Sequence, residues 1–92
     1  MGTRVGDPND TSPRLSEAEY RDRLRELPPS AKLVARVLRA EGPLPQGDIA
    51  AESLLPERTV RYALNRLEAD NLIERQYSLS DARKQVYTVT VR

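Results

Sequence analysis

The chain has 92 residues and contains no cysteine, histidine, phenylalanine or tryptophan. A chain of this length is expected to form one domain. Without thiols or imidazoles it lacks disulfides, thiolate nucleophiles and the commonest metal ligands, so we expect no enzyme, no metal site and no cofactor. Its 15 basic and 14 acidic residues leave a net charge of +1, so binding to a nucleic acid would depend on where the charges lie.

The N-terminal residues differ in composition from the rest. Residues 1–13 combine Gly2, Gly6, Pro8 and Pro13 with polar side chains, which is typical of a disordered tail. The folded domain is then expected over residues 14–92. The chain has no apolar run of the roughly 18 residues that a membrane span needs, and its N-terminus does not resemble a signal peptide. We therefore expect a cytoplasmic protein with no membrane partner.

The first predicted helix covers residues 16–27. Ser16 and Glu19 form a capping-box pattern at its start. Pro28 and Pro29 end it, because proline has no backbone N–H to donate. The helix mixes acidic and basic side chains along its length, so its apolar residues are expected either to pack on the domain or to form a dimer interface.

The second predicted helix covers residues 29–40 and ends at Gly42 and Pro43. Four of its side chains recur at helical spacing and are expected to face the core. They are Leu33, Val34, Val37 and Leu38.

Two further helices are predicted close together. A short helix over residues 45–53 follows Leu44, which we expect to form one residue of a small strand. A turn over residues 54–56 leads to a helix over residues 57–69. Asn71 is a good residue for the left-handed conformation that terminates a helix.

The periodicity then changes from helical to alternating. Residues 72–77 and 85–91 are predicted strands, and the polar residues 78–84 between them form a hairpin loop. Tyr77 and Tyr87 on these strands, like Tyr20 on the first helix, are interpreted as packing residues. The fold class is therefore mainly α with a small β-hairpin wing (α+β), a winged helix-turn-helix.

Helix 57–69 has two different faces. At about 100° per residue, its apolar side chains fall in one sector. Arg58, Tyr62 and Asn65 centre on the opposite sector, with Arg61 beside them. The simplest reading is an ordinary solvated face, and Tyr62 could instead be buried against a neighbouring helix.

Residues 29–91 resemble the winged helix-turn-helix of MarR-type transcriptional regulators. Short segments at positions 49–50, 59–60, 66–68 and 71–73 carry the resemblance, although the family usually has Gly where this chain has Asn71. The most specific match is Asp81-Ala82-Arg83, which fits the family's Asp-x-Arg wing motif. The resemblance implies that Arg83 enters the minor groove while Asp81 shapes the wing, although the two side chains could simply pair with each other.

The resemblance implies sequence-specific binding of double-stranded DNA, with helix 57–69 in the major groove and residues 78–84 in the minor groove. MarR proteins dimerise through long helices after the wing, and the chain ends at Arg92, so we expect a homodimer through helix 16–27 and no small-molecule ligand. The alternative is a protein-interaction module in a transcription or segregation assembly. The expected DNA-binding residues are Gln46, Arg58, Thr59, Arg61, Tyr62, Asn65, Arg66, Arg75, Arg83 and Lys84.

Overall fold

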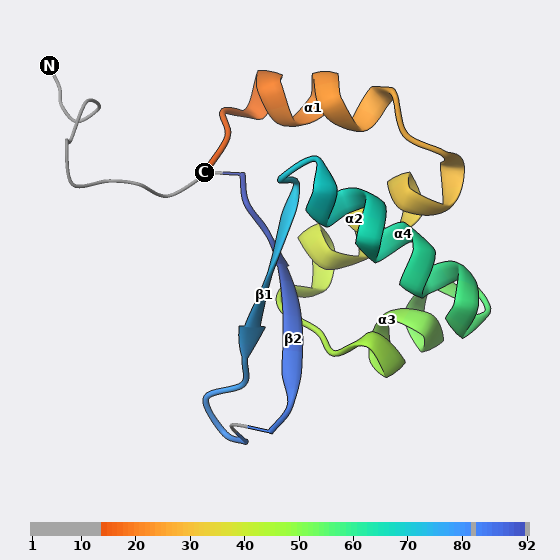
Figure 1. Ribbon diagram of the computed structural model, residues 1–92, viewed down its shortest axis with the longest axis vertical. Helices are drawn as coiled ribbons and strands as arrows, with labels where there is room; N and C mark the ends of the chain where they lie inside the picture. The colour runs from red at the N-terminus through yellow and green to blue at the C-terminus, as the bar shows by residue number, and fades with distance from the viewer. Residues whose placement is uncertain (1–13, 82, 92) are drawn as a thin grey trace, which may run out of the picture.

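The computed structural model describes residues 14–81 and 83–91, and the tail predicted over residues 1–13 lies outside this part of the chain. Four helices pack together, and an antiparallel hairpin projects from them (Figure 1). The mainly α fold with a hairpin wing is thereby confirmed. The elements in chain order are α1 (Glu17–Arg25), α2 (Pro29–Glu41), α3 (Gln46–Ser53), α4 (Glu57–Ala69), β1 (Ile73–Tyr77) and β2 (Gln85–Val89).

The predicted start of α1 is confirmed in detail. The Ser16 hydroxyl accepts a hydrogen bond from the Glu19 backbone N–H at 3.1 Å, and the Glu19 carboxylate accepts one from the Ser16 N–H at 3.0 Å. This reciprocal pair satisfies two donors that a helix start leaves unpaired. The helix ends at Arg25, two residues before the predicted end at residue 27.

The turn between α3 and α4 is tight. Leu54 closes α3 with φ 63° and ψ 22°, in the left-handed region that a leucine rarely occupies. Its N–H donates to the Ala50 carbonyl at 3.0 Å, and the buried Ser53 hydroxyl accepts from the Leu55 N–H at 3.3 Å. These bonds pair the backbone groups of the turn and fix the approach of α4 to α3.

The end of α4 follows the predicted left-handed pattern. Asn71 has φ 59°, its N–H donates to the Glu68 carbonyl at 3.0 Å, and the Leu72 N–H donates to the Leu67 carbonyl at 2.9 Å. These two bonds form a Schellman motif, which satisfies the last carbonyls of a helix and turns the chain. The motif directs the chain from α4 into β1 within three residues.

The hairpin joins the helical body at its base. The backbone of Leu44 pairs with Tyr87 through two hydrogen bonds of 3.1 and 2.8 Å, so the predicted single strand residue at Leu44 is confirmed. The buried Thr90 hydroxyl donates to the Asn71 carbonyl at 2.6 Å. Leu15 bridges to Val91 beyond the end of β2, which secures the segment before α1.

One core connects all the elements, but three residues predicted to pack in it lie outside it. The buried stripe of α2 runs through Ala31, Val34, Ala35 and Leu38. Leu33 is 37% exposed because it lies on nearly the opposite side of this helix, and Val37, beside the stripe, is half-buried. Tyr77 is 64% exposed because it ends β1, where the hairpin extends beyond the helices. The predictions for Leu33 and Tyr77 were wrong, and Val37 is only partly buried, whereas the predicted burial of Tyr20 and Tyr87 is confirmed.

Candidate nucleic-acid interface

Helix α4 has one buried side and one exposed side, as its sequence predicts. Its apolar residues Val60, Ala63, Leu64 and Leu67 are all buried in the core. The opposite side, here called the α4 outer face, is formed by exposed residues that could bind a partner. These residues are Arg58, Arg61, Tyr62 and Asn65.

Three side chains of the α4 outer face have unused hydrogen-bonding capacity. Within residues 14–81 and 83–91, Arg58, Arg61 and Asn65 make no side-chain hydrogen bond or ion pair. Two guanidinium groups and one amide therefore point away from the fold with their donors and acceptors available. Thr59, near the start of the helix, is half-buried beside this face, and Gln46 is half-buried at the start of α3.

Tyr62 and Arg66 form a pair on the same helix. An Arg66 Nη1 donates to the Tyr62 hydroxyl at 2.9 Å, and the Arg66 guanidinium lies 5.9 Å from the centre of the Tyr62 ring. Residues four apart on a helix are neighbours, so the spacing alone could have predicted this pair. Tyr62 is 50% exposed, which excludes its burial against a neighbouring helix.

Asp81 organises the described part of the wing. Its carboxylate accepts from the Arg83 N–H at 3.0 Å and lies 3.5 Å from the Arg83 Nε. Its carbonyl accepts from the Lys84 N–H at 2.9 Å, and the Lys84 carbonyl accepts from the Ser78 N–H at 2.8 Å. Asp81 thus both shapes the loop and contacts Arg83. The Arg83 side chain is still 93% exposed, so it remains accessible.

In the residues that the structure describes, the Arg75 side chain is paired with an acidic residue, unlike those of Arg58 and Arg61. From β1 it reaches back to α4, where two of its nitrogens donate to the Glu68 carboxylate at 2.9 and 3.3 Å. This hydrogen bonding, more than any other cause, raises the pKa of Arg75. This pair could not be predicted from local spacing, because the two residues lie on different elements, seven positions apart.

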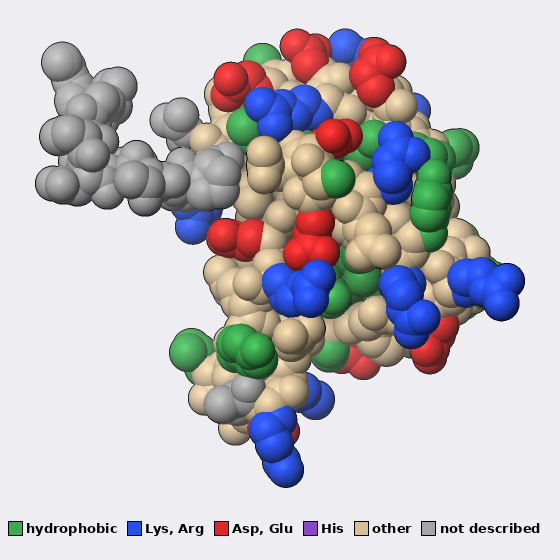
Figure 2. Space-filling view, viewed as in Figure 1, with side chains coloured by type: hydrophobic (Ala, Val, Ile, Leu, Met, Phe, Trp, Pro, Cys, Tyr) green, Lys and Arg blue, Asp and Glu red, His purple; other side chains and the backbone are tan. Residues whose placement is uncertain are grey.

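Acidic and basic side chains are mixed over the helical body on the face shown in Figure 2, and lysine and arginine side chains also lie at the far end of the hairpin. The described residues contain no group of three or more acidic side chains that could hold a metal ion. None of the helices in the described ranges is long and apolar enough to cross a membrane.

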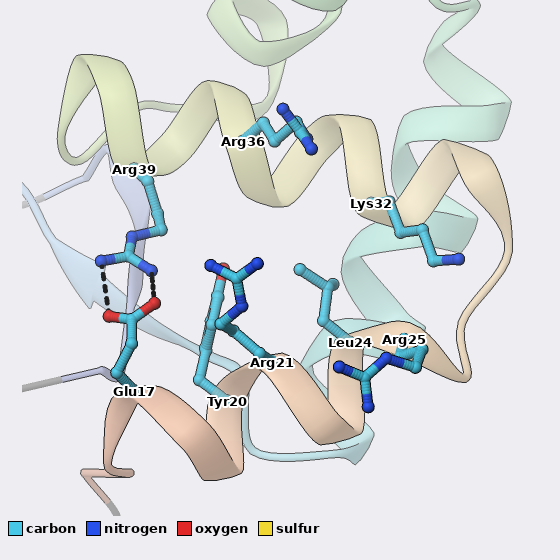
Figure 3. A pocket seen from close by; sticks show the side chains of 8 residues that line it. All are labelled: Glu17, Tyr20, Arg21, Leu24, Arg25, Lys32, Arg36 and Arg39. Carbon is cyan, nitrogen blue, oxygen red and sulfur yellow. Dashed lines mark hydrogen bonds and ion pairs between the residues drawn. The ribbon is translucent and has the colours of Figure 1, made fainter.

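A pocket of about 390 Å³ lies between α1 and α2, and no residue of α4 or the hairpin lines it (Figure 3). At one end the Arg39 guanidinium donates to both oxygens of the Glu17 carboxylate, at 2.7 and 3.0 Å, and lies 5.1 Å from the centre of the Tyr20 ring. This pairing joins the two helices. The lining residues are Glu17, Tyr20, Arg21, Leu24, Arg25, Lys32, Arg36 and Arg39.

Solved structures of bacterial regulators share this fold. A probable transcriptional regulator of Pseudomonas aeruginosa superposes with a TM-score of 0.67 at 22% identity, over 78% of this chain and 55% of that chain. AbfR of Staphylococcus epidermidis superposes with a TM-score of 0.64 at 29% identity, over 77% of this chain and 50% of that chain. A MepR mutant of S. aureus, bound to an oligodeoxyribonucleotide, superposes with a TM-score of 0.64 at 25% identity, over 79% of this chain and 56% of that chain.

The chain thus spans about half the length of these solved regulators. A comparison with curated protein sequences gives no significant match. The family model described as MarR family matches residues 26–84, which include α2 to β1 and the whole hairpin loop. That match covers more than half of the sequence and agrees with the fold. The chain therefore belongs to the MarR family.

Proposed function

We propose that the chain is a regulator that binds double-stranded DNA in a sequence-specific manner, with α4 in the major groove and the wing in the minor groove. The observation that carries the proposal is the α4 outer face, where Arg58, Arg61 and Asn65 are exposed and unpaired among the described residues. The major groove is about 12 Å wide and admits one helix. Arginine can bond guanine through two donors, and asparagine can bond adenine in the same way.

The wing supplies the second set of contacts. Arg83 is 93% exposed at the hairpin loop, with Lys84 exposed next to it. A narrow minor groove has an enhanced negative potential that attracts arginine, so we assign Arg83 to the groove and Lys84 to a phosphate. Asp81 holds the loop in the shape that presents both side chains.

The remaining contacts are assigned to the DNA backbone. Tyr62 and Arg66 hold each other at the side of the α4 outer face, where they can reach phosphate and sugar. Thr59 lies near the N-terminus of α4 and Gln46 at that of α3, where the helix dipole favours phosphate. The DNA-bound state of the S. aureus relative supports a nucleic-acid partner for this fold.

We further propose that two copies associate through α1. This helix contacts the body through Tyr20 and Leu24, and its other side is exposed with acidic and basic residues along it. An antiparallel pair of such helices can place opposite charges against each other. A symmetric dimer would read two half-sites about 10 bp apart, centre to centre.

A gel-shift titration against genomic fragments at low and moderate salt tests the proposal. Wild-type protein should bind, and its affinity should fall steeply with salt because phosphate contacts release counterions. Arg61→Ala should reduce the preference for specific over random duplexes, whereas Lys84→Ala should weaken both alike. Absence of salt-dependent binding by the wild type would favour a protein partner, for which the net charge of +1 is also suitable.

A further inference from the structure

Arg75 and Glu68 connect the wing to the recognition helix. The Arg75 Nη2 lies 2.9 Å from one Glu68 carboxylate oxygen, and Nε lies 3.3 Å from the other. The two parallel bonds fix the direction of the guanidinium as well as its distance. The side chains are 46% and 26% exposed, so both remain partly accessible to water.

Arg75 is also held from the other side, by its own hairpin. It pairs across the sheet with Tyr87, and its guanidinium lies 5.7 Å from the centre of the Tyr87 ring. Tyr87 is buried, and its backbone is bonded to Leu44. The arginine therefore links a carboxylate on α4 to a ring that is anchored in the body of the domain.

The position of this link matters for the geometry of the whole interface. Only three residues, 70 to 72, separate α4 from β1, and Arg83 lies at the far end of the hairpin. A small rotation of the hairpin at its base would therefore move Arg83 through a long arc. The Schellman turn fixes the backbone at that base, and the Glu68–Arg75 bonds oppose rotation from a second point.

We propose that Arg75 is a positioning residue, which with Glu68 holds the wing at the angle to α4 that lets both elements contact DNA together. This role replaces the phosphate contact expected from the sequence, because the carboxylate of Glu68 neutralises the charge that Arg75 would offer to DNA. The inference rests on the proposed DNA-binding function. An exposed ion pair adds little to folding stability, so its effect should appear mainly in binding.

The test compares Glu68→Gln, Arg75→Gln and the double variant on one duplex that the wild type binds. Glu68→Gln makes the protein more positive, so charge alone predicts tighter binding, whereas loss of positioning predicts weaker binding. If the wing without this pair adopts the angle that allows both elements to contact DNA about a tenth of the time, the Kd rises roughly tenfold. The double variant should bind no more weakly than either single variant, because all three remove the same link.

Two further measurements separate positioning from a phosphate contact. The dependence of log Kd on log salt should keep its slope in Arg75→Gln, whereas loss of a phosphate contact would lower it by about 0.9. In a hydroxyl-radical footprint at saturating protein, the positions protected under the wing and around α4 should match those of the wild type in all three variants, because the bound complex keeps the same contacts. Arg75→Lys, which keeps the charge without the two-donor geometry, should show a raised Kd like that of Arg75→Gln, whereas a phosphate contact would be largely retained by lysine.

Glu74→Gln is the matched control, because it also removes one negative charge, next to Arg75 in the sequence, and leaves the Glu68–Arg75 pair intact. This variant should bind DNA at least as tightly as the wild type. Tighter or unchanged DNA binding by Glu68→Gln would overturn the positioning role, and so would a slope of log Kd against log salt that falls by about 0.9 in Arg75→Gln. Either result would leave the proposed DNA-binding function in place. If the wild type bound no duplex at any salt concentration, the proposed function would fail and this inference with it.

Discussion

Leu54 offers a test of how the helix-turn-helix is held together. It sits in the left-handed region with φ 63°, and its side chain is 88% exposed. That conformation costs a non-glycine residue about 1–2 kcal/mol, because Cβ approaches the following carbonyl oxygen. Replacement by glycine removes this cost but gives the unfolded chain about 0.5–1 kcal/mol of extra conformational freedom.

The small buried part of the Leu54 side chain contributes only about 0.3 kcal/mol. The balance predicts that Leu54→Gly raises the free energy of unfolding by about 0.5 kcal/mol, or the Tm by about 2–4 °C. Urea denaturation followed by circular dichroism would measure the change. A loss of stability of 0.5 kcal/mol or more would contradict the assigned strain and would indicate that the leucine side chain packs against the fold.

Leu79 is the matched control for this substitution. It is fully exposed in the hairpin loop, and it does not have a positive φ. Leu79→Gly therefore adds freedom to the unfolded chain without relieving strain, and its free energy of unfolding should stay the same or fall. An increase equal to that of Leu54→Gly would mean that the gain comes from removing an exposed apolar side chain rather than from the backbone.

Three further substitutions test the packing of the helices. The Tyr20 hydroxyl is buried with no hydrogen-bond partner in the described part of the chain. Tyr20→Phe should therefore raise the free energy of unfolding by about 1 kcal/mol, as measured by a thermal melt. A lower Tm in this variant would mean that the hydroxyl has a hydrogen-bond partner after all. Hydrogen bonding to Arg39 lowers the pKa of Glu17 below its ordinary 4.5, so this pair stabilises the fold above that pH and loses its effect as the pH falls through the lowered pKa. Urea titrations at several pH values should therefore show Glu17→Gln less stable than the wild type at pH 7 and equally stable in strong acid, whereas a difference independent of pH would exclude the ion pair as its source. Leu67→Ala should cost about 2–5 kcal/mol because the side chain is fully buried, and a loss below 1 kcal/mol in urea would contradict that burial.

Local patterns in the sequence predicted much of the fold. The capping box at Ser16, the left-handed Asn71 and the buried stripe of α4 each depend on residues within one turn of a helix, and each is present in the structure. Such features follow from spacing and backbone chemistry alone. The left-handed Leu54 was not foreseen, because leucine rarely adopts that conformation and its identity gives no sign of it.

Contacts between elements were harder to predict. The pairs Glu17–Arg39 and Glu68–Arg75 join residues from different elements, so their partners depend on how the elements pack. The exposure of Tyr77 likewise depends on how far the hairpin extends beyond the helices. The helical spacing placed the α4 outer face correctly, but it could not show that Arg75 is already bonded to Glu68.

Selection of bound duplexes from a random pool tests the central claim most directly, since it asks whether α4 reads base edges. The wild type is predicted to enrich an inverted repeat with half-sites about 10 bp apart, and Asn65→Ala to lose the preference at one position in each half-site. No enrichment by the wild type, or the same motif from both proteins, would contradict the placement of α4 in the major groove.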